Sequence, residues 1–345
     1  MMRKGYTVTS LDRERVGILL ANTGSPASPD PHDVRSYLGA FLSDPCIRPM
    51  NMLCWWLILH LFIFPKRGIS SGAKYAKIWT DEGSPFDIEH RKLSLLLESA
   101  LDAEGRDVVV ELGMSYGSPF VEDGLKALRK QGCTKVVVVP LYPQSAFSTT
   151  GAVRKQLFRA IKRMKWDVPT SLVDTYSTDN VYLDAISETI QRSDFDAAAG
   201  DRIIFNFHSV PMNDINAGDT YQREVEESAK AIATRCAIPD DQWVIGYNCQ
   251  FDKGREWLHP FSREALTAWA REDGVFRVFM ICPNFATDCL ETLYDIDYEL
   301  KPFYDEQLKL AGHEPSERDF RYIPCLNGTE LHAKVLRHVI SPYID

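Results

Sequence analysis

Hydrophobic and polar positions along this chain form a regular succession of short apolar runs and longer amphipathic segments. The apolar runs have the length of buried strands, and turn residues bound them. The sequence predicts four strands in each half of the chain, at 16–22, 108–114, 135–141 and 170–174, then at 202–208, 243–247, 275–281 and 320–323. Helices are predicted at 31–42, 84–101, 119–131, 148–164, 221–236, 262–270, 286–311 and 330–340.

Strands that alternate with long helices indicate βαβ units, in which neighbouring strands are parallel. The simplest architecture is an α/β protein with two four-stranded parallel sheets, each flanked by helices and joined near residues 175–200. The length of 345 residues suits two domains. We expect them at 14–175 and 176–345, with the last helix packing back on the chain.

One apolar segment, 50–64, is unusual for a soluble protein and carries the adjacent tryptophans Trp55 and Trp56. It is shorter than the ~20 apolar residues that a membrane-spanning helix needs. Two interpretations remain open. The segment is either a buried core helix or an exposed apolar lip, residues 50–65, that grips a greasy ligand or contacts a bilayer.

Composition and motifs exclude several classes of function. The net charge of −9 and the absence of a basic stripe argue against nucleic acid as the main partner. No glycine-rich phosphate-binding motif supports a nucleotide enzyme. The eight cysteines are scattered without a Cys-x-x-Cys pair, which predicts reduced thiols. The amino-terminal residues lack the apolar core of a signal peptide, so a cytoplasmic protein is expected.

Three carboxylates recur along the predicted helix 286–311. Glu291, Asp295 and Glu299 follow one another at intervals of four residues, so they project from roughly one helix face. The helix follows the buried run 275–281, and α/β folds bind ligands at the carboxyl ends of their strands. The row is therefore either a solvated outer face or a path for a cation or for protons.

His208 ends the predicted strand 202–208 and is expected at the same sheet edge as the start of the acidic helix. A histidine in this place is often a structural residue with its hydrogen bonds satisfied. Paired with Glu291 across a cleft, it becomes a candidate base or metal ligand, because imidazole titrates near neutrality and binds first-row metals.

Several stretches resemble the signatures of ferrochelatases and occur in the same order. They are Phe41-Leu-Ser-Asp-Pro45, Tyr142-Pro-Gln144 with Ser148-Thr-Thr-Gly151, Phe205-Asn-Phe-His-Ser-Val-Pro-Met212 and Asp288-Cys-Leu-Glu-Thr-Leu-Tyr-Asp295. The similarity runs from about Val16 to Val339. It implies a chelatase-like fold of two Rossmann-like domains. It also implies insertion of Fe2+ into protoporphyrin IX, the last step of protohaem synthesis.

The resemblance implies roles for individual residues. His208 and Glu291 match the catalytic pair and, with Asp295 and Glu299, the metal-binding positions, on a helix with a π-type widening near the glutamate. The resemblance implies that Trp257, Tyr142 and the lip tryptophans Trp55 and Trp56 contact the porphyrin. The porphyrin propionates need hydrogen-bond donors, for which the hydroxyls of Tyr116, Ser148 and Thr149 are candidates, although such residues are also ordinary cap and turn residues. Fe2+ is then a substrate, and neither a cofactor nor a [2Fe–2S] cluster is expected. The lip implies peripheral contact with the inner membrane, and we expect a monomer or a weak homodimer.

Two departures from many bacterial relatives concern the rim: Ser115 replaces an arginine, and 248–250 reads Asn-Cys-Gln instead of Gln-Ser-Arg/Lys. Contacts to the porphyrin propionates are therefore expected to differ. Coproporphyrin III, or a corrin precursor that receives cobalt, remains an alternative substrate, although the apolar lip favours the less polar protoporphyrin. A non-catalytic haem or porphyrin carrier is the other alternative, which the presence of both His208 and Glu291 disfavours because a carrier needs no base.

Overall fold

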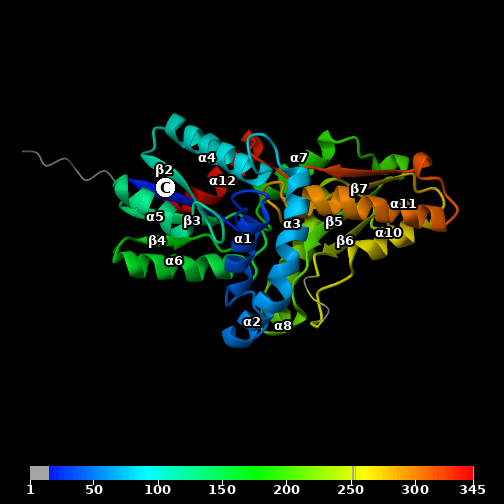
Figure 1. Ribbon diagram of the computed structural model, residues 1–345. Coiled ribbons are helices and arrows are strands. Elements are labelled where there is room, and N and C mark those ends of the chain that lie inside the picture. Colours follow the sequence, from blue (N-terminus) through cyan, green and yellow to red (C-terminus); the bar gives the residue numbers. More distant parts are fainter. Residues whose placement is uncertain (1–14, 251, 253, 345) are drawn as a thin grey trace, which may run out of the picture.

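The computed structural model describes residues 15–250, 252 and 254–344. The amino-terminal residues on which the signal-peptide argument rests lie outside this range, and so do residues 14 and 345, which bound the expected domains. Its strands form two four-stranded parallel sheets with helices on both faces (Figure 1). The first sheet, in spatial order β2-β1-β3-β4, contains β1 (Val16–Asn22), β2 (Val108–Met114), β3 (Lys135–Pro140) and β4 (Thr170–Leu172). The second, in order β6-β5-β7-β8, contains β5 (Arg202–His208), β6 (Trp243–Asn248), β7 (Arg277–Ile281) and β8 (Asp319–Ile323).

The predicted fold class is confirmed, and burial explains why the sequence pattern found these strands. All residues of the central strand β1 are buried, and so are the five inner residues of β5. Strands covered on both faces are apolar throughout, without the alternation of half-exposed strands. The edge strand β4 is shorter than predicted, because only three of its residues pair with β3 and all three are partly exposed.

Most helices lie close to their predicted positions. They are α1 (Pro31–Ser43), α4 (Pro85–Ala103), α5 (Val121–Lys130), α6 (Thr150–Met164), α9 (Tyr221–Arg235), α10 (Ser262–Ala270) and α12 (Glu330–Ile344), with short 3-10 turns η2 (Ala197–Ala199) and η4 (Pro315–Glu317). Outside the lip and the helix that continues it, two helices of the described residues are additional to the prediction: α7 (Asn180–Arg192) and the short α8 (Met212–Asn216). The expected joint at 175–200 is thus largely helical. Asp179 caps α7 by accepting from the amides of Val181 and Tyr182, a signal that the sequence contains.

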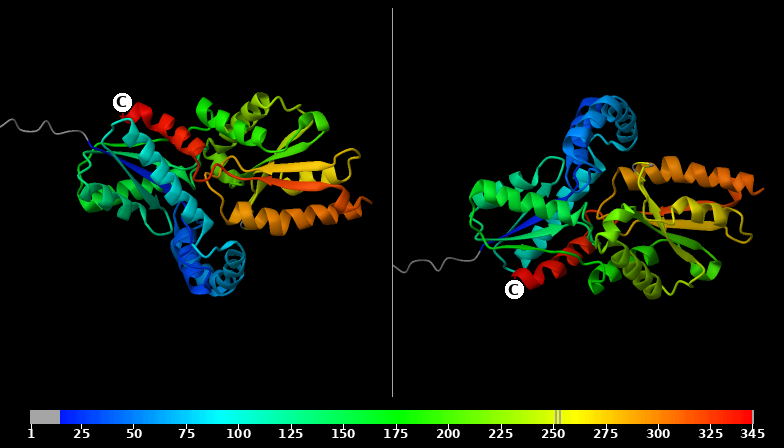
Figure 2. Two further views of the ribbon diagram at one scale, coloured as in Figure 1. Left: turned by 90° about the horizontal axis from the view of Figure 1, so that it is seen from above. Right: turned by 90° about the horizontal axis from the view of Figure 1, so that it is seen from below.

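The core extends across both halves of the molecule. Helix α12 follows β8 of the second sheet but contacts α4 and α7 and lies beside the first sheet (Figure 2). Leu93 and Leu97 of α4 share one buried cluster with Leu336 and Val339 of α12. The last described helix therefore covers apolar surface that the first half presents.

The apolar lip is mainly exposed. It forms α2 (Met52–Ile58), a π-helical turn η1 (Leu59–Ile63) and the start of α3 (Phe64–Ile78), and these helices project from the junction of the two sheets (Figure 2). Of residues 50–65 only Leu59 and Phe64 are buried, whereas Leu53 and Phe62 are 75% and 68% exposed. The interpretation of this segment as a buried core helix is therefore wrong.

The helical stretch is also longer than the sequence pattern indicated. It continues through Pro65, which lies in the first turn of α3 directly after the π turn, a position where a helix tolerates a residue without an amide hydrogen. By length and composition alone, Met52–Ile78 is the one helix in the described part of the chain that could cross a membrane, and 17% of its apolar window is buried. Its second half, α3, packs against α1 and the acidic helix of the same chain.

Tyr182 of α7 connects the two sheets through its hydroxyl group. The hydroxyl donates to the carbonyl oxygen of Pro283 after β7 (2.8 Å), and Gln144 after β3 lies 3.5 Å away. The ring of Tyr176 packs edge-to-face against that of Tyr182 with centroids 5.7 Å apart. The buried Tyr176 hydroxyl has no hydrogen-bond partner among the described residues, so it provides a matched comparison.

We expect Tyr182→Phe to lower the free energy of unfolding by about 1–2 kcal/mol, because the carbonyl of Pro283 is left buried without its donor. Tyr176→Phe should leave stability unchanged or raise it slightly, since it removes a hydroxyl that has no partner. Urea unfolding followed by tryptophan fluorescence measures both. An equal loss in the two variants would show that the hydrogen bond to Pro283 contributes nothing.

Candidate functional site

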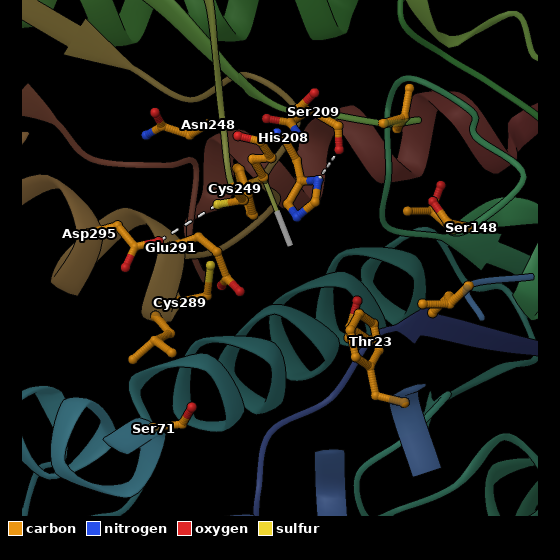
Figure 3. A pocket seen from close by; sticks show the side chains of 18 of the residues that line it. Thr23, Ser71, Ser148, His208, Ser209, Asn248, Cys249, Cys289, Glu291 and Asp295 are labelled. Carbon is orange, nitrogen blue, oxygen red and sulfur yellow. Dashed lines mark hydrogen bonds between the residues drawn. The ribbon is translucent and has the colours of Figure 1, made fainter. Parts of the chain in front are cut away.

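A cavity of about 740 Å³ lies at the junction of the two sheets. Its walls come from the loops after β1, β3, β5 and β6, from α1 and α3, and from the start of the acidic helix. Ligands of open parallel sheets bind at the carboxyl ends of the strands, and here both sheets present that edge to one space. Figure 3 shows that residues from both halves line this cavity, among them Thr23, Ser148 and His208.

His208 is the last residue of β5, so the strand delivers its ring to the cavity. Its Nδ1 lies 2.6 Å from the carbonyl oxygen of Ser209 (Figure 3). A carbonyl only accepts, so Nδ1 carries the proton and Nε2 carries the lone pair. Burial lowers the pKa of His208, and the negative charge of Glu291 opposes that shift. The neutral ring can therefore accept a proton or bind a metal ion through Nε2.

The acidic helix consists of two segments instead of the single helix predicted at 286–311. It begins at Leu290 as the π-helix η3 (Leu290–Leu300) and continues as α11 (Lys301–Leu310). The chain before it is not helical, and the amide of Asn327, in the loop after β8, donates to the carbonyl oxygen of Ala286 (3.0 Å). The π-type widening that the resemblance implied is confirmed.

Glu291, Asp295 and Glu299 all line the cavity, so the predicted row faces an interior space. Glu291 opens the row in the first turn of η3 and faces the same space as His208 (Figure 3). Asp295 accepts a hydrogen bond from the Cys249 thiol, with Sγ and Oδ2 3.6 Å apart. The interpretation of the row as a solvated outer face is therefore wrong.

Burial raises the pKa of Asp295 to about 7, and the negative charge of Glu291 adds to the shift. The ammonium of Lys74 on α3 opposes it: Nζ lies 3.7 Å from Asp295 Oδ1 and 2.6 Å from Glu299 Oε1. No three His, Cys, Asp or Glu side chains of the described residues are arranged to hold a metal ion. The geometry thus presents a pair, His208 with Glu291, and a partly neutralised row that leads to it.

Four of the predicted porphyrin contacts line the cavity, namely Trp257, Tyr142, Ser148 and Thr149. Trp257 is buried and its indole nitrogen donates to the carbonyl oxygen of Asp252 (3.0 Å). The hydroxyl of Tyr142 lies 2.6 Å from Thr23 Oγ1, which orients the phenol at the end of β3.

The other three predicted contacts are not part of the cavity lining in the described structure. Tyr116 is buried behind Phe41, with ring centroids 5.1 Å apart, and Phe41 itself lines the cavity. Trp55, within the lip, is partly buried, and its indole nitrogen donates to the carbonyl oxygen of Leu42 (2.6 Å). Trp56 is exposed. Tryptophan pairs in an apolar segment do not reveal from sequence which ring turns inward.

Several basic or thiol-bearing residues line the cavity although none was predicted as a site residue: Arg67, Lys74, Arg255, Arg263, Cys249 and Cys289. Lys74 is separated from Glu299 by 225 positions, so no local spacing connects them. Helix α3, which carries Lys74, does contain a signal that the sequence shows. Arg67, Ser71, Lys74 and Ile78 recur at helical intervals and face the cavity from one side of α3.

Burial raises the pKa of Asp295 from its ordinary value of 3.8 to about 7, so stability falls as the pH rises from about 4 to about 7, and the loss is complete above pH 7. We expect Asp295→Asn to raise the free energy of unfolding by about 1–2 kcal/mol at pH 8, after allowance for Lys74. The gain should be smaller at pH 5, where the carboxyl group is protonated in the folded state. Urea unfolding at the two pH values measures it. Destabilisation at pH 8 would mean that the pair with Lys74 outweighs the burial cost.

Known proteins resemble this chain along its whole length. A family model, Ferrochelatase, matches residues 15–343. Ferrochelatases of Nitrosococcus oceani, Actinobacillus pleuropneumoniae and Azoarcus sp. are 35%, 34% and 37% identical to it, over 99%, 97% and 91% of this chain and 90%, 100% and 83% of their own.

Solved structures support the fold. SirB from Bacillus subtilis with Fe3+ has a TM-score of 0.54 at 14% identity and covers 95% of this chain and 97% of its own. The sirohydrochlorin chelatase SirB in complex with cobalt gives 0.53 at 14% identity, over 96% and 95%. The match to the family model over nearly every residue, with relatives above 30% identity, shows that the chain belongs to the ferrochelatase family of lyases.

Proposed function

We propose that this ferrochelatase inserts Fe2+ into protoporphyrin IX and that His208 and Glu291 act at the point of insertion. The observation that carries the proposal is their common cavity: a neutral imidazole and a carboxylate face one space, and the acidic row continues from that carboxylate. In this proposal Asp295 and Glu299 bind the incoming ion before it reaches the porphyrin.

Insertion requires acceptors for two protons. A porphyrin releases both pyrrole protons as Fe2+ enters, so the products are haem and two protons. A base at the face of the porphyrin ring accepts each pyrrole proton, and the lone pair of that nitrogen then binds the metal ion. The lowered pKa of His208 keeps its ring neutral at pH 7, and Nε2 is the accepting atom. Glu291 supplies a carboxylate on the same side, which favours both the dication and the protonated imidazole.

We favour protoporphyrin over coproporphyrin because of the walls of the cavity. Leu38, Phe41 and Phe285 give it apolar surface, which suits vinyl and methyl groups. A tetracarboxylate would need more positive charge. Four basic side chains line the cavity, but the Arg255 guanidinium is paired with Asp252 at 2.7 Å and the Lys74 ammonium with Glu299 at 2.6 Å. Two propionates place a smaller demand on the rim than four.

We expect His208→Ala and Glu291→Gln each to lower kcat for metal insertion by at least about 100-fold, because each removes a proton acceptor or metal ligand at the ring. The measurement is loss of free protoporphyrin fluorescence with Fe2+ or Zn2+ under anaerobic conditions. Both variants should still bind porphyrin. His32→Ala, which removes an exposed histidine of α1, serves as the control and should keep full activity.

The same assay with coproporphyrin III decides the substrate. A higher kcat/KM for coproporphyrin in the unmodified protein would contradict the protoporphyrin proposal but leave metal insertion standing. Porphyrin binding without metal insertion by the unmodified protein would identify it as a carrier on this fold. That the protein needs no iron–sulfur cluster stays a prediction.

We also propose that the lip rests on the cytoplasmic face of the membrane as a peripheral contact. Leu53, Leu61 and Phe62 are more than half exposed there, and Trp56 adds an amphipathic ring. The lip adjoins α1 and α3, which form two walls of the cavity. A hydrophobic porphyrin could therefore move between the bilayer and the cavity with little exposure to water.

The double change Trp56→Glu with Phe62→Glu should reduce flotation with anionic phospholipid vesicles by about tenfold or more, because it places two charges on the apolar surface. Phe158→Glu, which alters an exposed phenylalanine of α6, is the control and should float like the unmodified protein. Trp55 is left intact because its indole supports α1. Unchanged flotation of the double variant would rule out the lip as the membrane contact.

A further inference from the structure

Lys74 spans the outer two carboxylates of the acidic row. Its Nζ lies 2.6 Å from Glu299 Oε1 and 3.7 Å from Asp295 Oδ1, and all three side chains line the cavity. The contact is partly sheltered, since the side chains of Lys74, Asp295 and Glu299 are 33%, 20% and 38% exposed. One ammonium thus occupies the part of the row that an ion entering from outside would meet before Glu291.

Helix packing and one ring contact place Lys74 beside the row. A Cβ at Gly72 of α3 would meet the carbonyl oxygen of Pro29 at 2.8 Å, so α3 lies directly against the segment that precedes α1. On the other side, Lys74 Nζ is 4.9 Å from the ring centroid of Tyr294, which stacks on Tyr298. The backbone of α3 is therefore fixed near the row, and the cation–π contact favours the position of the ammonium there without a covalent or buried constraint on the side chain.

A divalent ion needs the oxygens that Lys74 now contacts. At equal distance a dication attracts each carboxylate about twice as strongly as an ammonium does. It can therefore displace Lys74, whose long side chain has space along the cavity, whereas a monovalent ion has no such advantage. Removal of Lys74 would leave three carboxylates on one helix face without this counter-charge.

We propose that Lys74 is a specificity-determining residue of the metal path: it occupies the acidic row in the metal-free state, and each incoming divalent ion displaces it. The proposal rests on metal insertion at His208 and Glu291. Its consequence is weak binding along the row. A path must attract an ion strongly enough to admit it and weakly enough to release it to the next position, as in ion channels. Lys74 returns to the row when the ion moves on and so favours release toward Glu291.

Three variants test the proposal: Lys74→Met, Lys74→Arg and Lys77→Met. Lys77 lies one turn further along α3 over the ring of Tyr298, with Nζ 4.6 Å from the centroid, so its loss removes a cation from the same helix. Mn2+ binding without porphyrin, measured by electron paramagnetic resonance, reports on the oxygen-rich row, because Mn2+ prefers carboxylate ligands. Zn2+ insertion into protoporphyrin gives KM for the metal, KM for the porphyrin and kcat.

We expect Lys74→Met to tighten Mn2+ binding and to lower the KM for Zn2+ by at least about threefold. The reason is that the metal ion no longer competes with the ammonium, whose partly exposed ion pair is of modest strength. The kcat should fall at the same time, because the row now retains the ion, and the KM for porphyrin should not change. Lys74→Arg should restore values near those of the unmodified protein, and Lys77→Met should resemble it throughout.

Each other outcome overturns the proposal. If Lys74→Met and Lys77→Met changed the Mn2+ affinity and the KM for Zn2+ equally, the cause would be a general effect of surface charge. Weaker Mn2+ binding in Lys74→Met would show that Lys74 assembles the row, and unchanged constants would show a purely structural ion pair. If the unmodified protein inserts Zn2+ in these cases, only the role of Lys74 is lost. If it neither binds Mn2+ nor inserts Zn2+, the proposed function fails with it.

Discussion

The cost of burying carboxylates governs the structure of this site. Glu291, Asp295 and Glu299 lie on one face of η3 and line a cavity, where partial burial removes part of the hydration of an ionised group. The chain offsets this cost with few contacts. Lys74 lies beside the outer two, and the Cys249 thiol donates to Asp295. The cost that is not offset is visible in the raised pKa of Asp295.

Another carboxylate, that of the buried residue Asp288, fixes the start of the π-helix. Asp288 accepts hydrogen bonds from Tyr322 OH (2.5 Å), Thr292 Oγ1 (3.0 Å) and Asn327 Nδ2 (2.7 Å). These partners come from β8, η3 and the loop after β8, so several elements converge on one side chain. Because Asp288 is held, the next residues enter η3 with a defined orientation, and Glu291 reaches the cavity opposite His208.

The sequence predicts what depends on local pattern. Apolar runs predict β1 and β5 because both strands are buried on both faces, and the motifs around His208 and Glu291 predict their meeting because parallel strands share one carboxyl edge. Distant partners leave no such pattern. Lys74 meets Glu299 only because α3 crosses the acidic helix, and Tyr116 is kept out of the cavity by Phe41. The start of η3 was misplaced because tertiary hydrogen bonds to Asp288 override the helical periodicity.

The position of α12 has a consequence for biosynthesis. This helix follows all other described elements in the chain, yet it covers the Leu93 and Leu97 side chains of α4 in the first half. During translation the first sheet therefore emerges from the ribosome with an apolar face that no later segment yet covers. The amino-terminal half cannot complete its own core as it is made, although domains usually fold in order of synthesis. Until α12 is released and docks, the nascent protein presents an apolar surface on which molecular chaperones can act.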